Sequence, residues 1–439
     1  MLNKHEAYEV IDRVLAYCNY YTMVTITSDE TGLTRFANSE IHQNVFTADS
    51  VVKITIYDGK KKCEVTTNIL DEEALKETVL QAEEKLQFMP DGEFEMPEII
   101  DEEIAYEACD KELEKKFNIT RRAELIKEGI GILEEGYTAA GALSLNKMAL
   151  AIGNNRGTRR YGRVDYVSFN VVIMHEDGST GCVQYDTKDA DDLNVNECFK
   201  MAYNKAKLGL NPQSIEPGSY TVILEPMAAG EILNYMNFTG FSARAIQLGM
   251  SYLTGKLGQK VFGENITIVD DVNNENLFPI YFDFEGIRRK PLNIIDKGVA
   301  KEVAYDIRTA IKDGVETTGH GIGDGGYPIH LVMNGGNDTL ESLIKSTEKG
   351  MLVSKFHYMN IVDPRNAVLT GLTRDGFYLI ENGKIKCGLK NMRFTESMIN
   401  AFNNVIGITS ERKKVPGFFG VSYVPALKIE NFHFTGKTE

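Results

Sequence analysis

Some segments of this chain have apolar residues at strand spacing and others at helical spacing, and this mixture limits the folds that the chain can adopt. Alternation with period two over residues 52–57 is typical of a half-buried strand, whereas the apolar stripe of residues 75–86 has helical spacing. Asn382-Gly383, between two apolar runs, is the strongest short-range hairpin signal in the chain, and Asp58-Gly59 predicts a second hairpin. Strand runs mixed with isolated helices predict an α+β fold with largely antiparallel sheets.

Capping residues predict where three of the helices begin or end. Asp71 is a good N-cap for the helix that carries the apolar stripe. Asp338 with Glu341 predicts an acidic capping box for another helix, and Gly350 is expected to close that helix. Thr395 is expected to cap a third helix near the C-terminus.

The chain has 439 residues, which is too long for a typical single hydrophobic core. Two prolines and several acidic turns make residues 89–103 the best linker candidate, and Pro212 with Pro217-Gly218 marks a second boundary. The predicted parts are an N-terminal α/β domain over 1–90, a central α/β region over 104–211 and a C-terminal domain rich in antiparallel sheet over 217–439.

Charge and cysteine usage narrow the class of protein. A net charge of −15 and a pI of about 5.1 oppose direct binding to nucleic acid or to an anionic membrane surface. No apolar run approaches the ~18 residues that span a bilayer. Six cysteines without a C-x-x-C motif, and no recognisable signal peptide, are typical of reduced thiols in a cytoplasmic protein.

The sequence contains few motifs that are typical of catalytic, metal or nucleotide sites. Residues 321–326 match G-x-G-x-x-G, but Tyr327-Pro328 and a predicted strand follow, so the helix N-terminus that a dinucleotide site requires is missing. The chain contains neither H-E-x-x-H nor G-x-S-x-G. His320 and His330 flank the glycine segment and could meet in space. A metal bound by both histidines, or a relocated hydrolytic site near them, is a less favoured hypothesis.

Several segments, in a consistent order, resemble the TldD/PmbA family, whose members also carry the name modulator of DNA gyrase. Each segment is weakly specific by itself, but together they span most of the chain. They are Leu33–Asn44, Gly255–Val261 with Ile268–Asp271, Thr317–Gly319, Gly350–Gly376, Ile380–Lys384 and Asn391–Ser397.

The resemblance implies a position for a zinc site, which this chain lacks. TldD-type members carry H-E-x-x-x-H on a helix of the C-terminal half. The best register places Asn234 and Thr239 at the histidine positions and Tyr235 at the glutamate position. An amide, a hydroxyl and a phenol do not replace two imidazoles and a carboxylate. The resemblance therefore implies the PmbA/TldE-like type, without a metal or another cofactor and without catalytic residues of its own.

The leading hypothesis drawn from this resemblance is a metal-free subunit of a TldD/TldE-type peptidase that shapes a chamber for unfolded or extended peptides. The family implies a homodimer, or a heterodimer with a TldD-type protein. Arg374 and the backbone of the glycine segment 319–326 could orient a peptide. The alternatives are a stand-alone peptidase or hydrolase with a relocated site near His320 and His330, and a regulator of DNA gyrase that acts through protein contacts.

Overall fold

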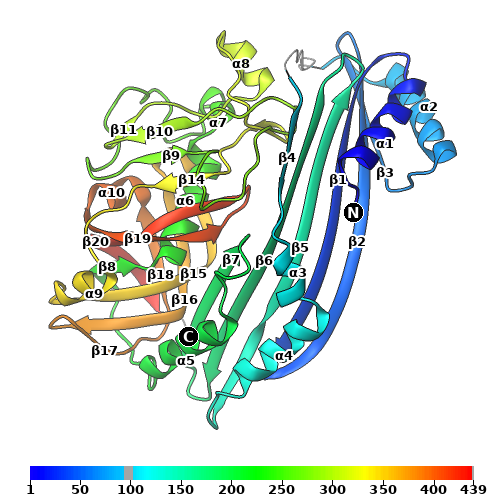
Figure 1. The fold of residues 1–439 in the computed structure, drawn as a ribbon. Helices are drawn as coiled ribbons and strands as arrows, with labels where there is room; N and C mark the ends of the chain where they lie inside the picture. The colour runs from blue at the N-terminus through cyan, green and yellow to red at the C-terminus, as the bar shows by residue number, and fades with distance from the viewer. Residues whose placement is uncertain (93–101, 438–439) are drawn as a thin grey trace.

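The computed structural model describes residues 1–92 and 102–437, which form two sheets that lie side by side, each with its own helices (Figure 1). Residues 93–101 of the predicted linker lie outside the described residues. Within the described part of the chain, no helix has the length and apolar character that crossing a membrane requires.

Long strands dominate the first sheet, which uses residues 21–187. It has seven strands in the order β3-β2-β1-β5-β6-β4, with β7 also paired to β6. Its elements in chain order are α1 (Lys4–Tyr17), β1 (Tyr21–Ala37), β2 (Glu40–Asp58), β3 (Lys61–Thr67), α2 (Glu72–Phe88), β4 (Ile104–Ala108), α3 (Lys111–Lys116), α4 (Ile119–Ile130), β5 (Tyr137–Asn154), β6 (Arg159–His175), β7 (Thr180–Thr187) and α5 (Val195–Leu208).

Helices cover the two ends of this sheet separately. At one end α1 and α2 bury apolar stripes against β1, β2 and β3, with Val10, Ile11, Leu75 and Val79 almost completely enclosed. At the other end α4 and α5 pack around Phe199, which contacts the backbone of α4 at Gly129. The middle and the outer edge of the sheet on the β2 side have less cover (Figure 1).

The second sheet contains eleven strands and holds the largest hydrophobic core. Its path runs β11-β10-β9-β14-β20-β18-β16-β15-β8, with β17 paired to β16 and β19 paired to β20. The strands are β8 (Gly218–Leu224), β9 (Ile268–Asp270), β10 (Leu292–Asp296), β11 (Val299–Ala300), β14 (Leu331–Met333), β15 (Lys349–Asp363), β16 (Val368–Glu381), β17 (Lys384–Gly388), β18 (Met392–Ser397), β19 (Val405–Pro416) and β20 (Val421–Lys437).

Short helices and one small ribbon complete the second half. They are α6 (Pro226–Gly240), α7 (Ala243–Gln247), α8 (Ile307–Asp313), α9 (Leu340–Lys345), the 3-10 turn Pro364–Asn366 and α10 (Met398–Asn403), with the two-stranded ribbon β12 (Gly321–Ile322) and β13 (Gly325–Gly326). The glycine segment is therefore a tight ribbon that leads into β14. No helix begins at its end.

The predicted α+β class is confirmed, and most strand pairs are antiparallel; the parallel pairs are β4 with β6, β8 with β15 and β14 with β20. The hairpin predicted at Asn382-Gly383 joins β16 to β17, and both residues have positive φ, 51° and 72°. Asp71 caps α2 by accepting the amide of Ala74.

Three capping predictions are wrong. Thr339, rather than Asp338, is the N-cap of α9, and its capping box uses Ser342 rather than Glu341. That helix ends at Lys345, and Gly350 lies in β15. Thr395 lies within β18, so Ser397 occupies the N-cap position of α10.

The predicted division into three parts remains a prediction. Strand β1, from the first predicted part, pairs with β5, from the second, over residues 23–36. Residues 1–90 and 104–211 therefore contribute to one sheet, whereas the strands after residue 217 form the other.

Candidate functional site

Helix α6 carries the positions that the sequence singled out for a lost metal site. Pro226 occupies its first turn, where a missing amide hydrogen costs nothing. Ten of its fifteen residues are buried, so the helix lies inside the second half with few of its side chains in solvent. At its C-terminal end, Gly240 leaves room for the Tyr252 ring, which a β-carbon at residue 240 would meet at 2.2 Å.

A cleft of about 270 Å³ opens beside α6. One wall is α6 itself, another is the middle of β15, and the third is the turn between β19 and β20. The lining residues are Glu231, Asn234, Tyr235, Lys355, Phe356, His357, Tyr358, Met359, Pro416, Gly417 and Phe418. Two of the three degenerate metal positions, Asn234 and Tyr235, therefore face this cleft.

Each of those three side chains donates an internal hydrogen bond. The Asn234 amide donates to the carbonyl of Pro416 at 3.2 Å. The Tyr235 hydroxyl donates to the carbonyl of Met359 at 2.6 Å, and its ring meets Phe418 edge-on at 5.0 Å. Thr239 is buried and donates to the carbonyl of Tyr235, one helical turn earlier. These side chains fasten α6 to its neighbours.

This set of donors does not fit zinc. Zinc in proteins takes imidazole, thiolate or carboxylate ligands, usually four in a tetrahedron. The cleft offers one carboxylate, Glu231, and one imidazole, His357. Among residues 1–92 and 102–437, no group of three or more histidine, cysteine, aspartate or glutamate side chains is arranged to hold a metal ion.

Glu231 is the most perturbed ionisable group in the cleft. Burial raises its pKa to about 7, and the nearby carboxylate of Asp375 acts in the same direction. The backbone amide of Phe356, which donates to Glu231 at 2.7 Å, and the ammonium of Lys355 oppose this rise. Near neutral pH the side chain can therefore both donate and accept a proton.

The sequence analysis did not single out Glu231. A signal was present, because Glu231 precedes Asn234 and Tyr235 by three and four residues, and this spacing places side chains on one helical face. Its perturbation depends on β15, which lies more than a hundred residues further along the chain.

Strand β15 is irregular where it borders the cleft. Its pairing with β16 shifts between His357 and Asn360, and Tyr358 has a positive φ of 48°. The Tyr358 side chain is 72% exposed as a result. Partial burial and the cations of Arg374 and Lys355 lower the pKa of His357.

Arg374 lies near the cleft, as a possible peptide-orienting group should. It is directly opposite Lys355 in the β15–β16 pair, and its side chain is about half exposed. Arg374 is not among the residues that line the cleft, and it does not belong to the cluster that contains His320 and His330.

His320 and His330 do meet in space, around Asp270. His320 Nε2 lies 3.5 Å and His330 Nδ1 lies 3.8 Å from Asp270 Oδ1, and Arg289 lies 3.6 Å from the other carboxylate oxygen. All four side chains are almost completely buried. Backbone carbonyls of Thr318 and Phe278 accept from the remaining ring nitrogens of His320 and His330.

The electrostatics of this cluster lower the pKa of the aspartate and of both histidines. Burial alone would raise the pKa of Asp270, but the Arg289 guanidinium and His320 hold it well below its usual range. Burial lowers the pKa of His320, and it lowers that of His330 to about 4. Neither histidine lines the α6 cleft, and the catalytic role of the pair stays a prediction.

Comparison with known proteins identifies relatives of the whole second half. Residues 217–436 match the model of the PmbA/TldA metallopeptidase C-terminal domain. An uncharacterized protein of Methanocaldococcus jannaschii is 30% identical over 249 residues, which is 50% of this chain and 58% of that protein. A protein of Haemophilus influenzae named metalloprotease PmbA homolog is 23% identical over 400 residues, covering 85% of this chain and 83% of its own length.

The fold has a solved counterpart. The crystal structure of TldE from Thermococcus kodakarensis matches with a TM-score of 0.85 over 98% of this chain and 100% of that one, at 20% sequence identity. The matched region spans about half the length of three archaeal relatives.

Proposed function

The chain belongs to the PmbA/TldD family of metallopeptidases, and we propose that within this family it is a metal-free subunit that holds extended peptide beside a catalytic partner. The observation that supports the proposal is the set of hydrogen bonds made by three side chains of α6. The resemblance predicts the zinc-ligand positions at Asn234, Tyr235 and Thr239. Each of these side chains donates a hydrogen bond to a backbone carbonyl of this chain. No catalytic step through a metal is proposed for this chain.

The cleft beside α6 is the proposed place of contact with peptide. Lys355 and Arg374 supply positive charge near it, and Phe418 and Tyr358 expose aromatic surface at its mouth. The break in pairing between His357 and Asn360 leaves part of the β15 backbone out of the ladder with β16. The carbonyls of Tyr358 and Met359 already accept from Asn360 and Tyr235. The backbone amides of these two residues are therefore the groups proposed to bind an extended chain, with little dependence on its sequence.

The proposed partner is a TldD-type protein with an intact H-E-x-x-x-H helix. Peptide hydrolysis needs an activated nucleophile and a group that stabilises the oxyanion. The α6 cleft provides side chains that can position a peptide and one titratable carboxyl, Glu231. It does not provide both an activated nucleophile and a group that stabilises the oxyanion. A partner that supplies the missing groups would make the combined site complete.

The test compares the chain alone with the chain plus such a partner. The substrate is a disordered protein such as casein, with and without a chelator. We expect cleavage only in the mixture, and we expect the chelator to abolish it. Replacing Lys355 and Arg374 by glutamine should weaken substrate binding in the mixture, whereas the same change at the exposed pair Lys260 and Lys301 should not.

A stand-alone hydrolase is the second candidate function, and Glu231 is the observation that favours it. A buried carboxyl with a pKa of about 7 in a cleft is suited to general acid–base catalysis. Cleavage by the chain alone that resists a chelator and is lost in Glu231→Gln would establish this function and contradict the partner-subunit proposal.

A further inference from the structure

Four aromatic side chains gather beside the α6 cleft, and two of them are exposed to solvent. Phe238 lies on α6, Phe418 and Phe419 lie in the turn between β19 and β20, and Tyr327 follows the ribbon β12–β13. Phe238 is 46% exposed and Phe418 is 58% exposed. Single exposed apolar side chains are common, but an exposed group of them is typical of an interaction site. We call these four residues the aromatic cluster.

The rings of the aromatic cluster contact one another in two arrangements. Tyr327 and Phe419 stack, with ring centroids 4.2 Å apart and an interplanar angle of 18°. Phe238 is nearly parallel to both, at 6.4 Å and 10° from Tyr327 and at 6.2 Å and 21° from Phe419. Phe418 instead stands at 66° to Phe238, with the centroids 6.3 Å apart. The two exposed rings therefore meet at an angle and do not form one flat surface.

The turn that carries two of these rings is held in place by its backbone. The amide of Gly417 donates to the carbonyl of Gly420 at 2.7 Å, which closes the turn. A β-carbon at residue 417 would meet the Asn234 oxygen of α6 at 1.9 Å, and one at residue 420 would meet the carbonyl of Ile329 at 2.3 Å. The turn therefore packs against α6 on one side and against the segment that leads into β14 on the other. Rings on a fixed backbone lose little conformational entropy when they bind a ligand.

The aromatic cluster continues the α6 cleft. Phe418 belongs to both, because it lines the cleft and contacts Phe238. Tyr235 also lines the cleft, and it meets the Phe418 ring edge-on at 5.0 Å. Phe238 follows Tyr235 by three residues, and this spacing places both side chains on one face of α6. A peptide that lies in the cleft therefore has the exposed rings directly beside it.

We propose that Phe238 and Phe418 bind an aromatic side chain of the peptide in the α6 cleft, so that this chain prefers polypeptide segments that contain phenylalanine, tyrosine or tryptophan. This inference rests on the proposed function, because it takes an extended peptide as the occupant of the cleft. Aromatic rings favour edge-to-face and offset-stacked contacts. A guest ring beside two rings that stand 66° apart can meet one of them with its face and the other with its edge.

Charge favours an aromatic guest over a cationic one. The faces of aromatic rings also attract ammonium and guanidinium groups. Lys355 lines the cleft and Arg374 is opposite it in the β15–β16 pair, so a guest cation would approach two cations. Asp375, 3.8 Å from each of them, offsets one of these charges, and burial raises the pKa of Glu231 to about 7, so its charge is incomplete at neutral pH. A neutral guest ring avoids the repulsion.

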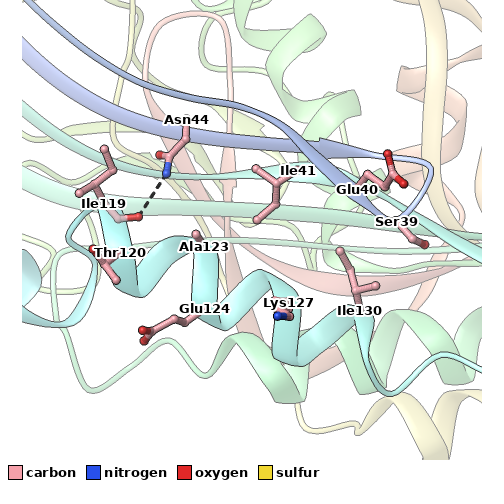
Figure 2. Close-up of a pocket in the computed structure, with 10 residues that line it drawn as sticks. All are labelled: Ser39, Glu40, Ile41, Asn44, Ile119, Thr120, Ala123, Glu124, Lys127 and Ile130. Carbon is pink, nitrogen blue, oxygen red and sulfur yellow. Dashed lines mark hydrogen bonds between the residues drawn. The ribbon is translucent and has the colours of Figure 1, made fainter.

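A larger groove in the first half of the chain provides an aliphatic surface for comparison. It has a volume of about 710 Å³ and lies between the β1–β2 hairpin and α4 (Figure 2). Ile41, Ile119, Ala123 and Ile130 are its apolar lining residues, and none of the side chains that line it is aromatic. Because aliphatic side chains do not stack with a ring, this groove offers a control position for the experiment below.

The first test measures which side chain the cleft prefers. The probes are short, fluorescein-labelled peptides of glycine, serine and alanine that differ at one central position, which is phenylalanine, leucine, alanine or arginine. Fluorescence anisotropy gives the dissociation constant of each peptide for the unaltered chain. We expect the phenylalanine peptide to bind roughly two- to tenfold more tightly than the leucine peptide, because ring contacts add to the burial of apolar area. The alanine and arginine peptides should bind more weakly than the leucine peptide.

The second test removes the exposed rings and keeps their apolar character. Phe238→Leu and Phe418→Leu, alone and together, should reduce the preference for phenylalanine over leucine toward equal binding of the two peptides. Binding of the leucine peptide itself should change little. The matched controls are Phe88→Leu, at an 82% exposed ring on α2, and Ile119→Ala, at a 52% exposed side chain in the groove of Figure 2. Both controls should keep the full preference.

The outcomes separate this inference from the proposed function. Equal binding of the phenylalanine and leucine peptides, or an unchanged preference in the double leucine variant, would overturn the inference. If replacing Lys355 and Arg374 by glutamine still weakens the binding of those peptides, the peptide-holding cleft survives that failure. Absence of binding by every peptide would contradict both. Leucine variants that keep the preference but no longer associate with a TldD-type partner would assign the rings to a protein interface and overturn the inference as well.

Discussion

Replacing Asp270 by asparagine should destabilise the protein more than replacing any surface aspartate. Asp270 is fully buried at the end of β9 and is the counter-ion of Arg289, which is 4% exposed. Its Oδ2 also accepts the backbone amides of Ile329 and His330, at 2.6 and 2.9 Å. Asparagine keeps the shape and one acceptor but removes the charge, so the buried Arg289 guanidinium loses its main counter-charge and retains the weaker interaction with Asp283.

The size of the loss follows from the distance and the burial. Two unit charges 3.6 Å apart attract by roughly 4–5 kcal/mol at an effective dielectric constant of about 20. Removing one member of a buried ion pair typically costs about 3–5 kcal/mol, since the other member stays desolvated. We therefore expect Asp270→Asn to lower the free energy of unfolding by about 3–5 kcal/mol.

A surface pair of the same residue types provides the matched control. Asp324 and Arg244 lie 3.0 Å apart, which is closer than the buried pair, but the Asp324 side chain is 71% exposed. Asp324→Asn should cost less than about 1 kcal/mol, because solvent screens the pair. Distance alone predicts the opposite order of the two variants.

Urea unfolding followed by far-UV circular dichroism measures both variants, and the chain has no tryptophan to follow by fluorescence. The depressed pKa of Asp270 stabilises the folded state above the ordinary aspartate pKa of about 4, and this contribution fades as the pH falls below it. The gap between the unaltered protein and Asp270→Asn should narrow in acid. A loss smaller than that of Asp324→Asn would refute the reasoning.

Three further predictions concern the α6 cleft. The raised pKa of Glu231 means that its ionisation opposes folding, so the free energy of unfolding should fall as the pH rises from about 4.5 to 7. Urea titrations at each pH should show that Glu231→Gln removes roughly 1–3 kcal/mol of that fall. Tyr235→Phe should cost about 1–3 kcal/mol in the same assay, since the carbonyl of Met359 loses its donor, while Tyr358→Phe, at an exposed ring, should be neutral. Elemental analysis of the purified chain should find no stoichiometric zinc, and one tightly bound zinc per chain would contradict the account of α6.

Predictions from the sequence succeeded where a few adjacent residues determine the conformation. Asn382 and Gly383 both adopt positive φ, which most other residues resist, so this dipeptide fixes the β16–β17 turn almost by itself. Asp71 caps α2 through one bond to the amide three residues later. The prediction of Asp338 as an N-cap was wrong, although it too concerned neighbouring residues. The adjacent Thr339 takes the N-cap position because its side chain and that of Ser342 form reciprocal hydrogen bonds.

Features that depend on distant residues could not be predicted in this way. Apolar alternation located the part of β2 that is buried, but residues 40–51 are exposed on both faces and carry no alternation to detect. The perturbed Glu231 needs β15 beside it, and the cluster around Asp270 assembles residues from four separate segments. The family resemblance supplied the position of α6, whereas its packing had to come from the structure.

The packing of α6 indicates what a histidine at residue 234 would meet. The Asn234 amide group occupies the space beside Gly417, where a β-carbon would meet the Asn234 oxygen at 1.9 Å. An imidazole at residue 234 is larger than this amide, and the turn of residues 416–418 leaves it little room. Tyr235 in turn fastens β15 at Met359 and packs on Phe418. The turn, the bulged strand and the helix therefore fit one another around Asn234 and Tyr235, and replacing Asn234 by histidine without moving the turn would strain the helix.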